Sequence, residues 1–407
     1  MRILCLGNGD NVGVRVYLKL KNYKQNVKLY RLLADEDPQR GNPYLYFSKD
    51  QVDKNNDIKP INDDLLKIRN ISLFSSKATG EINDSFDIVF ITGGWHALIY
   101  SRKIKLPKIF IPVGYEIHRK AREYKAIPNM KELFLNFRQT IRNYFYGWLT
   151  RNSLSKVTKI LDWFPPTVAV NKSLGFEDKI LYMAFGEDLK KNKALVKKEL
   201  LQELNFLTAS AKRVFLWFSR VNFLDPNKAN YKGADLFIKA LKQQENSLST
   251  GELLVYMGLH GEEVNEFKEF VKKSSVHKYI RWINHLEYPE LMAYLSINNA
   301  VLFTDFGEVN AGISGIGRDG YAMGIPMVNS TTDEIMVKQY TFPGPRTYAN
   351  TEEEIATAMK EFIFMNEEDF SIMKKRTSDY GKQYIDQSFF VKRLLKAAHF
   401  LMNHESK

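Results

Sequence analysis

The feature that most constrains the fold of this chain is an alternation of short, continuous apolar runs with longer helical stretches. Runs that are apolar at consecutive positions, and not only at every second one, are typical of parallel strands covered by helices on both faces. A first series comprises Ile3–Leu6, Val27–Leu33, Asp87–Thr92, Lys108–Val113, Val168–Val170 and Ile180–Phe185. A second series comprises Val214–Phe218, Leu253–Met257, Tyr279–Ile283, Val301–Thr304 and Pro326–Val328. Two such series predict an α/β protein with two doubly wound, Rossmann-like domains.

The length of the chain agrees with this division. Its 407 residues are more than one hydrophobic core usually serves, so about two domains are expected. The stretch 186–206 is charged and poor in β-forming residues, and we place the seam between the domains there. The predicted boundaries are 1–190 for the first domain, 191–380 for the second, and 381–407 for a C-terminal helix that packs back on the first.

The composition excludes several classes of protein. A hydrophobic content of 44% with 26% charged residues indicates a globular chain and not a disordered one. No stretch approaches the roughly 18 consecutive apolar residues of a membrane span, and the N-terminus lacks the features of a signal peptide. Cys5 is the only cysteine, which rules out an internal disulfide and a cysteine-based metal cluster. We therefore expect a cytoplasmic protein with no metal and no cofactor.

The net charge of +12 is concentrated in one segment. Residues 118–160 hold ten Lys or Arg and two acids, and so contribute +8. Apolar residues there recur at steps of three and four, which predicts one apolar face of a long helix beginning near Pro128. They are Met130, Leu133, Phe134, Phe137, Ile141, Phe145 and Trp148. Such a face commonly packs in a core with a solvated basic face behind it, but it also suits an anionic membrane surface, a nucleic acid or a phosphate-rich substrate.

A glycine-rich turn, CLGNGDNVGV, follows the first apolar run. Glycines let backbone N–H groups approach an anion at the start of a helix, so we predict Gly9, Asp10 and Asn11 as an acceptor or phosphate loop. The spacing G-x-G-x-x-x-G is one residue longer than the dinucleotide fingerprint, although the acids at 35–37 stand where a ribose-binding acid would. An NAD-dependent oxidoreductase therefore stays open as an alternative.

Two cations follow the first strand of the second series. Arg220 stands at the carboxyl tip of that strand, and Lys232 opens a helix after a polar loop. Ligands of doubly wound domains bind at the carboxyl ends of strands. A guanidinium fork beside the point charge of a lysine suits a diphosphate, so we predict both residues as phosphate ligands.

The stretch LFTDFGEVNAGISGIGRDGYAMGIPMVNS, residues 302–330, places a glycine-rich loop between a buried strand and a helix. Small residues leave backbone N–H groups bare just ahead of a helix N-terminus, which favours a phosphate or sugar hydroxyls. The residues predicted to line this seat are Ser314, Gly315, Ile316 and Gly317. Glu308 and Asp319 suit hydrogen bonds from sugar or ribose hydroxyls, and two acids at one strand end also suit an acid–base pair.

The second half of the chain resembles the C-terminal, nucleotide-sugar-binding domain of GT-B retaining glycosyltransferases of the family 4-like, group 1 type. The resemblance rests on several motifs that occur in the family's order. They are NKSLGFEDKILYMAFGED, FSRVNF with YKGADLFIKAL, VYMGLHGEEVNEF, IRWINHLEYPELMAYLSINNAVLFTDF and RDGYAMGIPMVNS. The resemblance covers most of residues 160–400, whereas the first half resembles the family only loosely.

This resemblance implies a hexosyltransferase that moves a sugar from a UDP- or GDP-sugar to an acceptor, with retention of the anomeric configuration. The donor would bind the second domain, and a glycan or lipid-linked acceptor at the inner membrane face would bind the first, across a cleft. Arg220 and Lys232, with the amides of residues 314–317, would stabilise the leaving diphosphate. Backbone near Ile283 and His285 would recognise the base.

The resemblance also implies catalytic residues. His118 corresponds to a histidine often found near the reacting sugar, and His96 is a second candidate. Together with Glu308 and Asp319, His118 makes up the predicted catalytic set. The usual site of the family needs no metal, and no nucleic-acid partner is expected.

One departure from the family leaves other functions open. The family has two glutamates separated by seven residues. Here Asp319 stands at the second position, Ala311 at the first, and Glu308 is the nearest acid. A non-catalytic binder of sugar nucleotides or of nucleic acid remains an alternative, although no nucleic-acid module is recognisable. A nucleotide-sugar epimerase of similar two-domain shape is another.

Overall fold

The computed structural model describes residues 1–7, 11–23, 25–32, 58–61, 66–68, 73–74, 76–93, 95–112, 137–162, 165–183, 186, 188–221, 223–226, 231–284, 286–306, 315–329 and 346–404. The chain divides into two compact units. The first unit consists of Met1–Asp162, Thr167–Met183 and Val391–Lys407. The second unit consists of Trp163–Pro166 and Ala184–Phe390.

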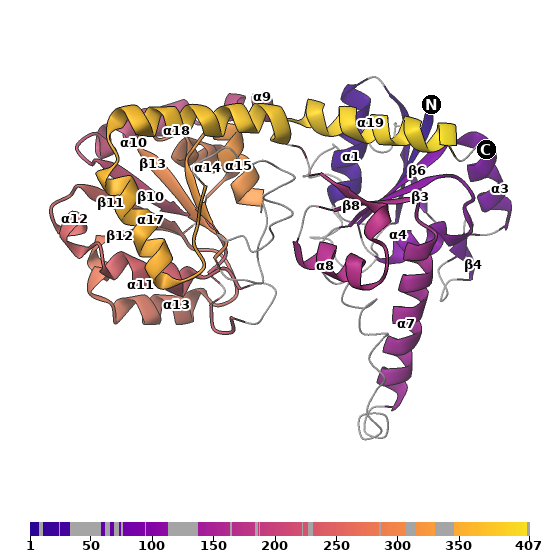
Figure 1. Ribbon diagram of the computed structural model, residues 1–407, viewed down its shortest axis with the longest axis horizontal. Coiled ribbons are helices and arrows are strands. Elements are labelled where there is room, and N and C mark those ends of the chain that lie inside the picture. The colour runs from indigo at the N-terminus through magenta and orange to yellow at the C-terminus, as the bar shows by residue number, and fades with distance from the viewer. Residues whose placement is uncertain are drawn as a thin grey trace. The chain divides into compact units, whose positions relative to one another are not determined.

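The first unit is built on a parallel sheet that has seven strands within the described residues (Figure 1). Their order across the sheet is β3 (Ile58–Ile61), β2 (Asn26–Leu32), β1 (Arg2–Gly7), β6 (Ile88–Gly93), β7 (Lys108–Pro112), β8 (Lys159–Asp162) and β9 (Ile180–Tyr182). A short antiparallel pair, β4 (Leu66–Ile68) and β5 (Leu73–Phe74), lies apart from this sheet. The helical elements are α1 (Asn11–Asn22), α3 (Ser76–Ser85), α4 (Trp95–Tyr100), η3 (Ser101–Lys103), α7 (Phe137–Ser155), α8 (Pro165–Ser173) and η4 (Glu177–Lys179).

The second unit is also built on a parallel sheet, which has six strands among the described residues. Their order is β12 (Ile280–Ile283), β11 (Leu253–Gly258), β10 (Arg213–Trp217), β13 (Ala300–Thr304), β14 (Met327–Asn329) and β15 (Arg346–Tyr348). The helical elements are α9 (Leu189–Ala194), α10 (Lys198–Thr208), α11 (Ala234–Lys242), α12 (Glu245–Ser249), α13 (Val264–Lys272), η5 (Ser275–Tyr279), α14 (Tyr288–Leu295), α15 (Gly315–Met323), α17 (Glu352–Phe364), α18 (Glu367–Tyr380) and the π-helical η7 (Gly381–Ile385). The last helix, α19 (Gln387–His404), contributes its residues from Val391 onward to the first unit.

The central strands of the second sheet explain why helices cover both of its faces. Every residue of β10 and β13 is buried. Because side chains alternate between the faces of a strand, Phe215 and Phe303 enter one hydrophobic cluster, while Leu216 and Leu302 enter another on the opposite face. The prediction of two doubly wound α/β domains is confirmed.

The predicted strand at Val168–Val170 is wrong, because these residues lie in helix α8. That helix begins with Pro165 and Pro166, and proline suits a first helical turn because its fixed φ is already helical. The strand between β7 and β9 in the sheet is β8 (Lys159–Asp162), which the sequence analysis did not predict. Helix α7 ends before this strand, at Ser155.

Two residues of the predicted apolar stripe are exposed on helix α7. Core packing is the commoner role of an apolar stripe, yet Phe145 and Trp148 are 46% and 40% exposed, and Tyr144 beside them is 46% exposed. The buried apolar residues of this helix include Leu149, which packs with Ile99 of α4. The interpretation of Phe145 and Trp148 as core residues is therefore wrong.

Helix α15 lies unusually close to the second sheet, and glycine makes this possible. A Cβ atom on Gly320 would lie 2.9 Å from Sδ of Met327 and 3.0 Å from Cδ2 of Leu302. On another side of the helix, a Cβ on Gly381 would lie 2.4 Å from the carbonyl oxygen of Tyr321. The position of α15, which carries Asp319, therefore depends on two glycines that allow backbone to approach its neighbours.

We expect Gly320→Ala to lower the free energy of unfolding of the second unit by about 1–3 kcal/mol, because the added methyl group overpacks the contact with β13 and β14. Gly315→Ala is the matched control on the same helix. The nearest atom to its new Cβ is 3.9 Å away, so its effect should stay within about 0.5 kcal/mol. Urea unfolding of both variants measures the difference, and equal stabilities would contradict the packing argument.

Candidate functional site

The candidate site lies at the carboxyl edge of the second sheet, between β10 and β13. The chain leaves β10 for β11 and β12 on one side, and then returns to pair β13 against the other side of β10. Strand order reverses at this place. In open α/β sheets the loops diverge at such a switch point and leave a crevice in which ligands bind.

Four polar residues meet at this edge, and we call them the switch-point cluster: Ser219, Lys232, Thr304 and Asp305. Nζ of Lys232 lies 2.7 Å from Oδ1 of Asp305, and the side chain of Asp305 is only 1% exposed. The hydroxyl of Thr304 donates to Oδ2 of Asp305 at 2.9 Å, and the hydroxyls of Thr304 and Ser219 share a hydrogen bond. The predicted phosphate ligand Lys232 is thus held in place by a buried carboxylate.

The backbone of Asp305 has a φ of 55°, which lies in the left-handed region. Few side chains adopt this conformation, but Asp and Asn are among those that tolerate it. The unusual conformation comes directly after β13, at the point where the chain turns toward the loop before α15. It places the carboxylate of Asp305 within reach of Lys232.

Contacts with Phe306 and with Asp235 fix the turn that carries Lys232. The N–H of Phe306 donates to the carbonyl oxygen of Lys232 at 3.0 Å, and a Cβ on Gly233 would lie 2.5 Å from Cβ of Phe306. Gly233 has a φ of 69°, which also requires glycine. Before the turn, the hydroxyl of buried Tyr231 donates to Asp235 at 2.8 Å, and burial together with this carboxylate raises the pKa of Tyr231. These contacts hold the start of α11 at the crevice.

Arg220 follows Ser219 at the same strand end. Its side chain is exposed, and it forms no ion pair with any residue that the structure describes. The next residue, Val221, donates its N–H to the carbonyl oxygen of His260 at 2.8 Å, so the loop after β10 is tied to the end of β11. The structure therefore brings both predicted phosphate ligands to one edge of the sheet.

Asp319 lies in α15, and its carboxylate is oriented by two side chains that the sequence analysis did not single out. Oδ1 accepts hydrogen bonds from the hydroxyl of Tyr288 at 2.8 Å and from Nδ2 of Asn192 at 3.3 Å. Tyr288 begins α14. Asn192 lies in α9 and precedes Asp319 by more than a hundred residues. No local pattern in the sequence could have paired them.

Other predicted donor residues lie at the same end of the second sheet. Ile283 is the last residue of β12, and its carbonyl oxygen accepts from the N–H of Leu259 at 2.9 Å. Gly315, Ile316 and Gly317 form the first turn of α15. His285, Glu308 and Ser314 lie outside the described residues, so their roles stay predictions.

The first unit holds a second switch point, between β1 and β6. Gly7 at the end of β1 pairs with Thr92 near the end of β6. Asn11 begins α1 directly after this edge, and His96 lies in α4 directly after β6. The carboxyl edge thus receives both segments that were predicted to contact the acceptor. Gly9, Asp10 and His118 lie outside the described residues.

The described residues contain neither a metal-binding cluster nor a helix that could span a membrane. No cluster of three or more His, Cys, Asp or Glu side chains that could hold a metal ion occurs among them. Among the same residues, no helix combines the length and the apolar character that crossing a membrane requires.

In fold, the chain is similar to solved structures over almost its whole length. The structure of Anabaena Alr3699/HepE in complex with UDP superposes with a TM-score of 0.63 at 13% identity, over 98% of this chain and 99% of that one. HepE is also solved with UDP and glucose and with UDP-glucose. A glycosyltransferase from Rickettsia africae ESF-5 gives a TM-score of 0.63 at 13% identity, over 99% of both chains.

The same fold also occurs in a domain of a protein that is named for another activity. The N-terminal domain of trehalose-6-phosphate phosphatase from Candida albicans gives a TM-score of 0.58 at 11% identity, over 97% of this chain and 96% of that one. No protein-family model and no curated protein matches the chain in sequence. The GT-B architecture predicted from the sequence is thus confirmed as a fold, and the function has to be argued from the site.

The left-handed backbone at Asp305 gives a test of the switch-point cluster. Asp305→Ala should cost about 2–4 kcal/mol in the free energy of unfolding, because it forces alanine into the left-handed region and removes the buried carboxylate that pairs with Lys232 and accepts from Thr304. Asp305→Asn tolerates this φ and keeps an oxygen for Thr304, so it should cost about 1–2 kcal/mol. Denaturant unfolding distinguishes the two variants, and an alanine variant as stable as the asparagine variant would count against the cluster.

Proposed function

We propose that this chain is a glycosyltransferase that transfers a hexose from a nucleoside diphosphate sugar to an acceptor, with retention of configuration at the anomeric carbon. The observation that carries the proposal is the position of Lys232. Its ammonium is held beside Asp305 at a switch point, in a chain with the GT-B fold. Departure of a diphosphate needs fixed positive charge at the place where the phosphates lie.

The charges at the crevice suit this step. When the bond to the sugar breaks, negative charge grows on the phosphate oxygens of the leaving group. The ammonium of Lys232 has three donors, so it can contact a phosphate while it keeps Asp305 as a partner. The exposed guanidinium of Arg220 offers a fork for a second pair of oxygens. The first turn of α15 adds the partial positive charge of a helix N-terminus.

The remaining predicted residues keep the roles that the family resemblance gives them. We propose Glu308 and Asp319 at the hydroxyls of the donor, Ile283 and His285 at the base, His118 and His96 near the reacting sugar, and Gly9, Asp10 and Asn11 at the acceptor. The hydrogen bonds from Tyr288 and Asn192 support the assignment of Asp319, because a fixed carboxylate positions a hydroxyl better than a mobile one.

The proposed donor is a UDP-sugar, with a GDP-sugar as the second choice. HepE, which shares the fold, is solved with UDP and with UDP-glucose. For the acceptor we propose a glycan or a lipid-linked molecule on the cytoplasmic side of the inner membrane. This choice is supported by the exposed aromatic side chains of α7.

Helix α7 offers a surface that suits peripheral contact with an anionic membrane. Tyr144, Phe145 and Trp148 are each between 40% and 46% exposed, and the rings of Phe145 and Trp148 lie 6.0 Å apart. Aromatic side chains partition into the headgroup region of a bilayer, and neighbouring cations strengthen the attraction to anionic lipids. The segment 118–160 supplies those cations.

The donor site is tested by replacing Lys232. We expect Lys232→Ala to weaken binding of the UDP-sugar about tenfold or more, because one charge-assisted contact to a phosphate is lost. Lys239→Ala is the matched control, since Lys239 lies on the same helix and pairs with Asp235 at 2.9 Å, away from the crevice. Thermal shift with UDP-, GDP- and ADP-sugars and with NAD measures the binding.

Other outcomes of the same panel would redirect the proposal. A shift with NAD alone would reject the glycosyltransferase and move the site to the turn after β1. Binding of a UDP-sugar with neither transfer nor hydrolysis would indicate a non-catalytic binder. Where transfer occurs, nuclear magnetic resonance of the product gives its anomeric configuration, and an inverted product contradicts retention.

Membrane contact through α7 makes a separate prediction. The double variant Phe145→Ser, Trp148→Ser should lower binding to phosphatidylglycerol vesicles about a hundredfold or more, because each buried aromatic contributes about 1.5–3 kcal/mol. Phe364→Ser is the control, since Phe364 is 74% exposed but lies on α17 in the second unit. Sedimentation with vesicles measures the effect. Equal loss in both variants, or no loss in the first, would reject this surface.

A further inference from the structure

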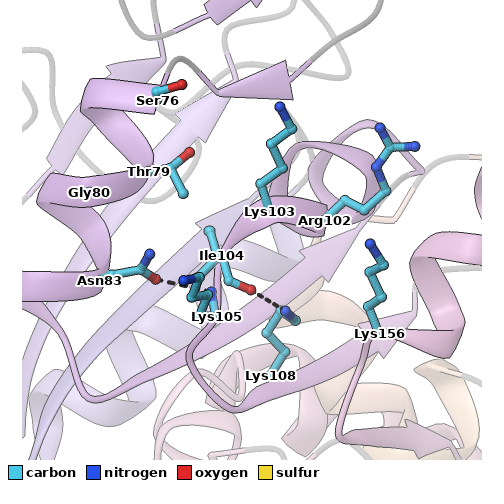
Figure 2. A pocket seen from close by; sticks show the side chains of 10 residues that line it. All are labelled: Ser76, Thr79, Gly80, Asn83, Arg102, Lys103, Ile104, Lys105, Lys108 and Lys156. Atoms are coloured by element: carbon cyan, nitrogen blue, oxygen red, sulfur yellow. Dashed lines mark hydrogen bonds between the residues drawn. The ribbon is translucent and has the colours of Figure 1, made fainter.

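The first unit holds a basic cavity that the proposed reaction does not use. It has a volume of about 690 Å³ (Figure 2). Its lining consists of Ser76, Thr79, Gly80, Asn83, Arg102, Lys103, Ile104, Lys105, Lys108 and Lys156. We propose that this cavity is a binding site for a small polyanion that carries phosphate groups. The inference does not depend on the glycosyltransferase proposal.

The cavity lies at the amino edge of the first sheet. Helix α3 leads into β6, the residues after η3 lead into β7, and Lys156 precedes β8, so the lining gathers where three adjacent strands begin. The switch points of both units lie at the opposite, carboxyl ends of their strands. The cavity is therefore distinct from the proposed donor site and from the predicted acceptor loop.

The lining has an unbalanced charge. Of the ten lining residues that the structure describes, five are Arg or Lys and none is Asp or Glu. Like charges gathered around one concave space repel each other and focus a positive potential into it, which favours an anion of several charges. Lys108 contributes from a buried position, where it is 5% exposed and its Nζ donates to the carbonyl oxygen of Ile104.

The wall that faces the basic side chains consists of neutral hydrogen-bonding groups. Figure 2 shows Ser76, Thr79 and Asn83 along α3, across the cavity from Lys103 and its neighbours. Oδ1 of Asn83 accepts a hydrogen bond from the N–H of Lys105 at 3.1 Å. Because the oxygen of the amide is used in this way, its NH₂ group is the part of Asn83 that can donate to a ligand. Hydroxyls and an amide NH₂ suit phosphate oxygens, whereas carboxylates there would repel them.

The volume of the cavity suits a small molecule. A volume of about 690 Å³ lies within the range of pockets that hold small ligands. Among the described residues of the lining, Ile104 is the only large apolar side chain, so charges and hydrogen-bonding groups provide the recognition there. A soluble phosphate compound and the phosphate headgroup of a lipid offer the same chemistry.

Gly80 gives a direct test, because its position faces open space. A Cβ atom there would have no neighbour within 4 Å, so a longer side chain fits without displacing others. Gly80→Glu adds a negative charge at the cavity, and Gly80→Gln adds a side chain of the same size without charge. We expect the wild type and Gly80→Gln to bind inorganic tripolyphosphate in calorimetry at low salt. Gly80→Glu should bind it about tenfold more weakly, as one added like charge predicts.

A second readout locates the binding site. Tripolyphosphate should protect Lys103, Lys105 and Lys156 from acetylation in mass spectrometry, while exposed Lys360 in the second unit reacts as before. The double variant Lys103→Gln, Lys156→Gln replaces Gly80→Glu if the latter unfolds. The proposal is overturned by equal affinity in the two Gly80 variants, by an absence of protection at the three lysines, or by no binding to the wild type.

A competition experiment distinguishes a lipid headgroup from a soluble phosphate compound as the natural ligand. Phosphatidylcholine vesicles that carry phosphatidic acid are added to the complex with tripolyphosphate, and pure phosphatidylcholine vesicles serve as the control. Displacement by the first vesicles alone identifies a lipid headgroup as the source. Binding that survives both identifies a soluble phosphate compound, and either result leaves the site in place.

Discussion

The parallel pairing of β10 with β13 is the interaction on which the candidate site depends. It joins strands that are more than eighty residues apart and brings Ser219 beside Thr304. Through Thr304 it fixes Asp305, and through Asp305 it holds Lys232. Without this ladder the four polar residues of the switch-point cluster would belong to separate loops. The backbone hydrogen bonds of one strand pair thus turn distant residues into a single charged site.

Two glycines near this site allow helices to pack closely against their neighbours, and this matters more here than the flexibility of glycine. Gly233 and Gly320 each occupy a place where a Cβ atom would meet a neighbour at 3.0 Å or less. The first brings the start of α11 to the end of β13, and the second brings α15 onto the sheet. Both helices begin at the carboxyl edge of the second sheet, the edge at which Lys232 lies. The close packing at Gly233 and Gly320 therefore helps to set where the helix N-termini and their partial positive charges lie.

The basic residues of the two units have different surroundings. In the second unit, a lysine at the crevice is paired with a buried carboxylate, which fixes its position. In the first unit, five basic residues line one cavity, and the described part of its lining contains no acid. A paired cation is suited to precise placement, whereas a cluster of unbalanced cations is suited to attracting an anion. The net charge of +12 alone does not distinguish these arrangements.

The sequence by itself determined the fold class, because continuous apolar runs such as Val214–Phe218 reflect local burial on both faces. It also placed Arg220 and Lys232 near one strand end, since strand ends can be read from such runs. It misplaced Val168–Val170, where a short apolar run suits either a helix or a strand, and it favoured burial of Phe145 and Trp148, which are exposed. Only the tertiary structure decided that Asp305 pairs with Lys232, that Tyr288 orients Asp319, and that five basic residues between 102 and 156 share a cavity. These contacts join residues far apart in the chain, and strand pairing and helix packing set them, which no local periodicity encodes.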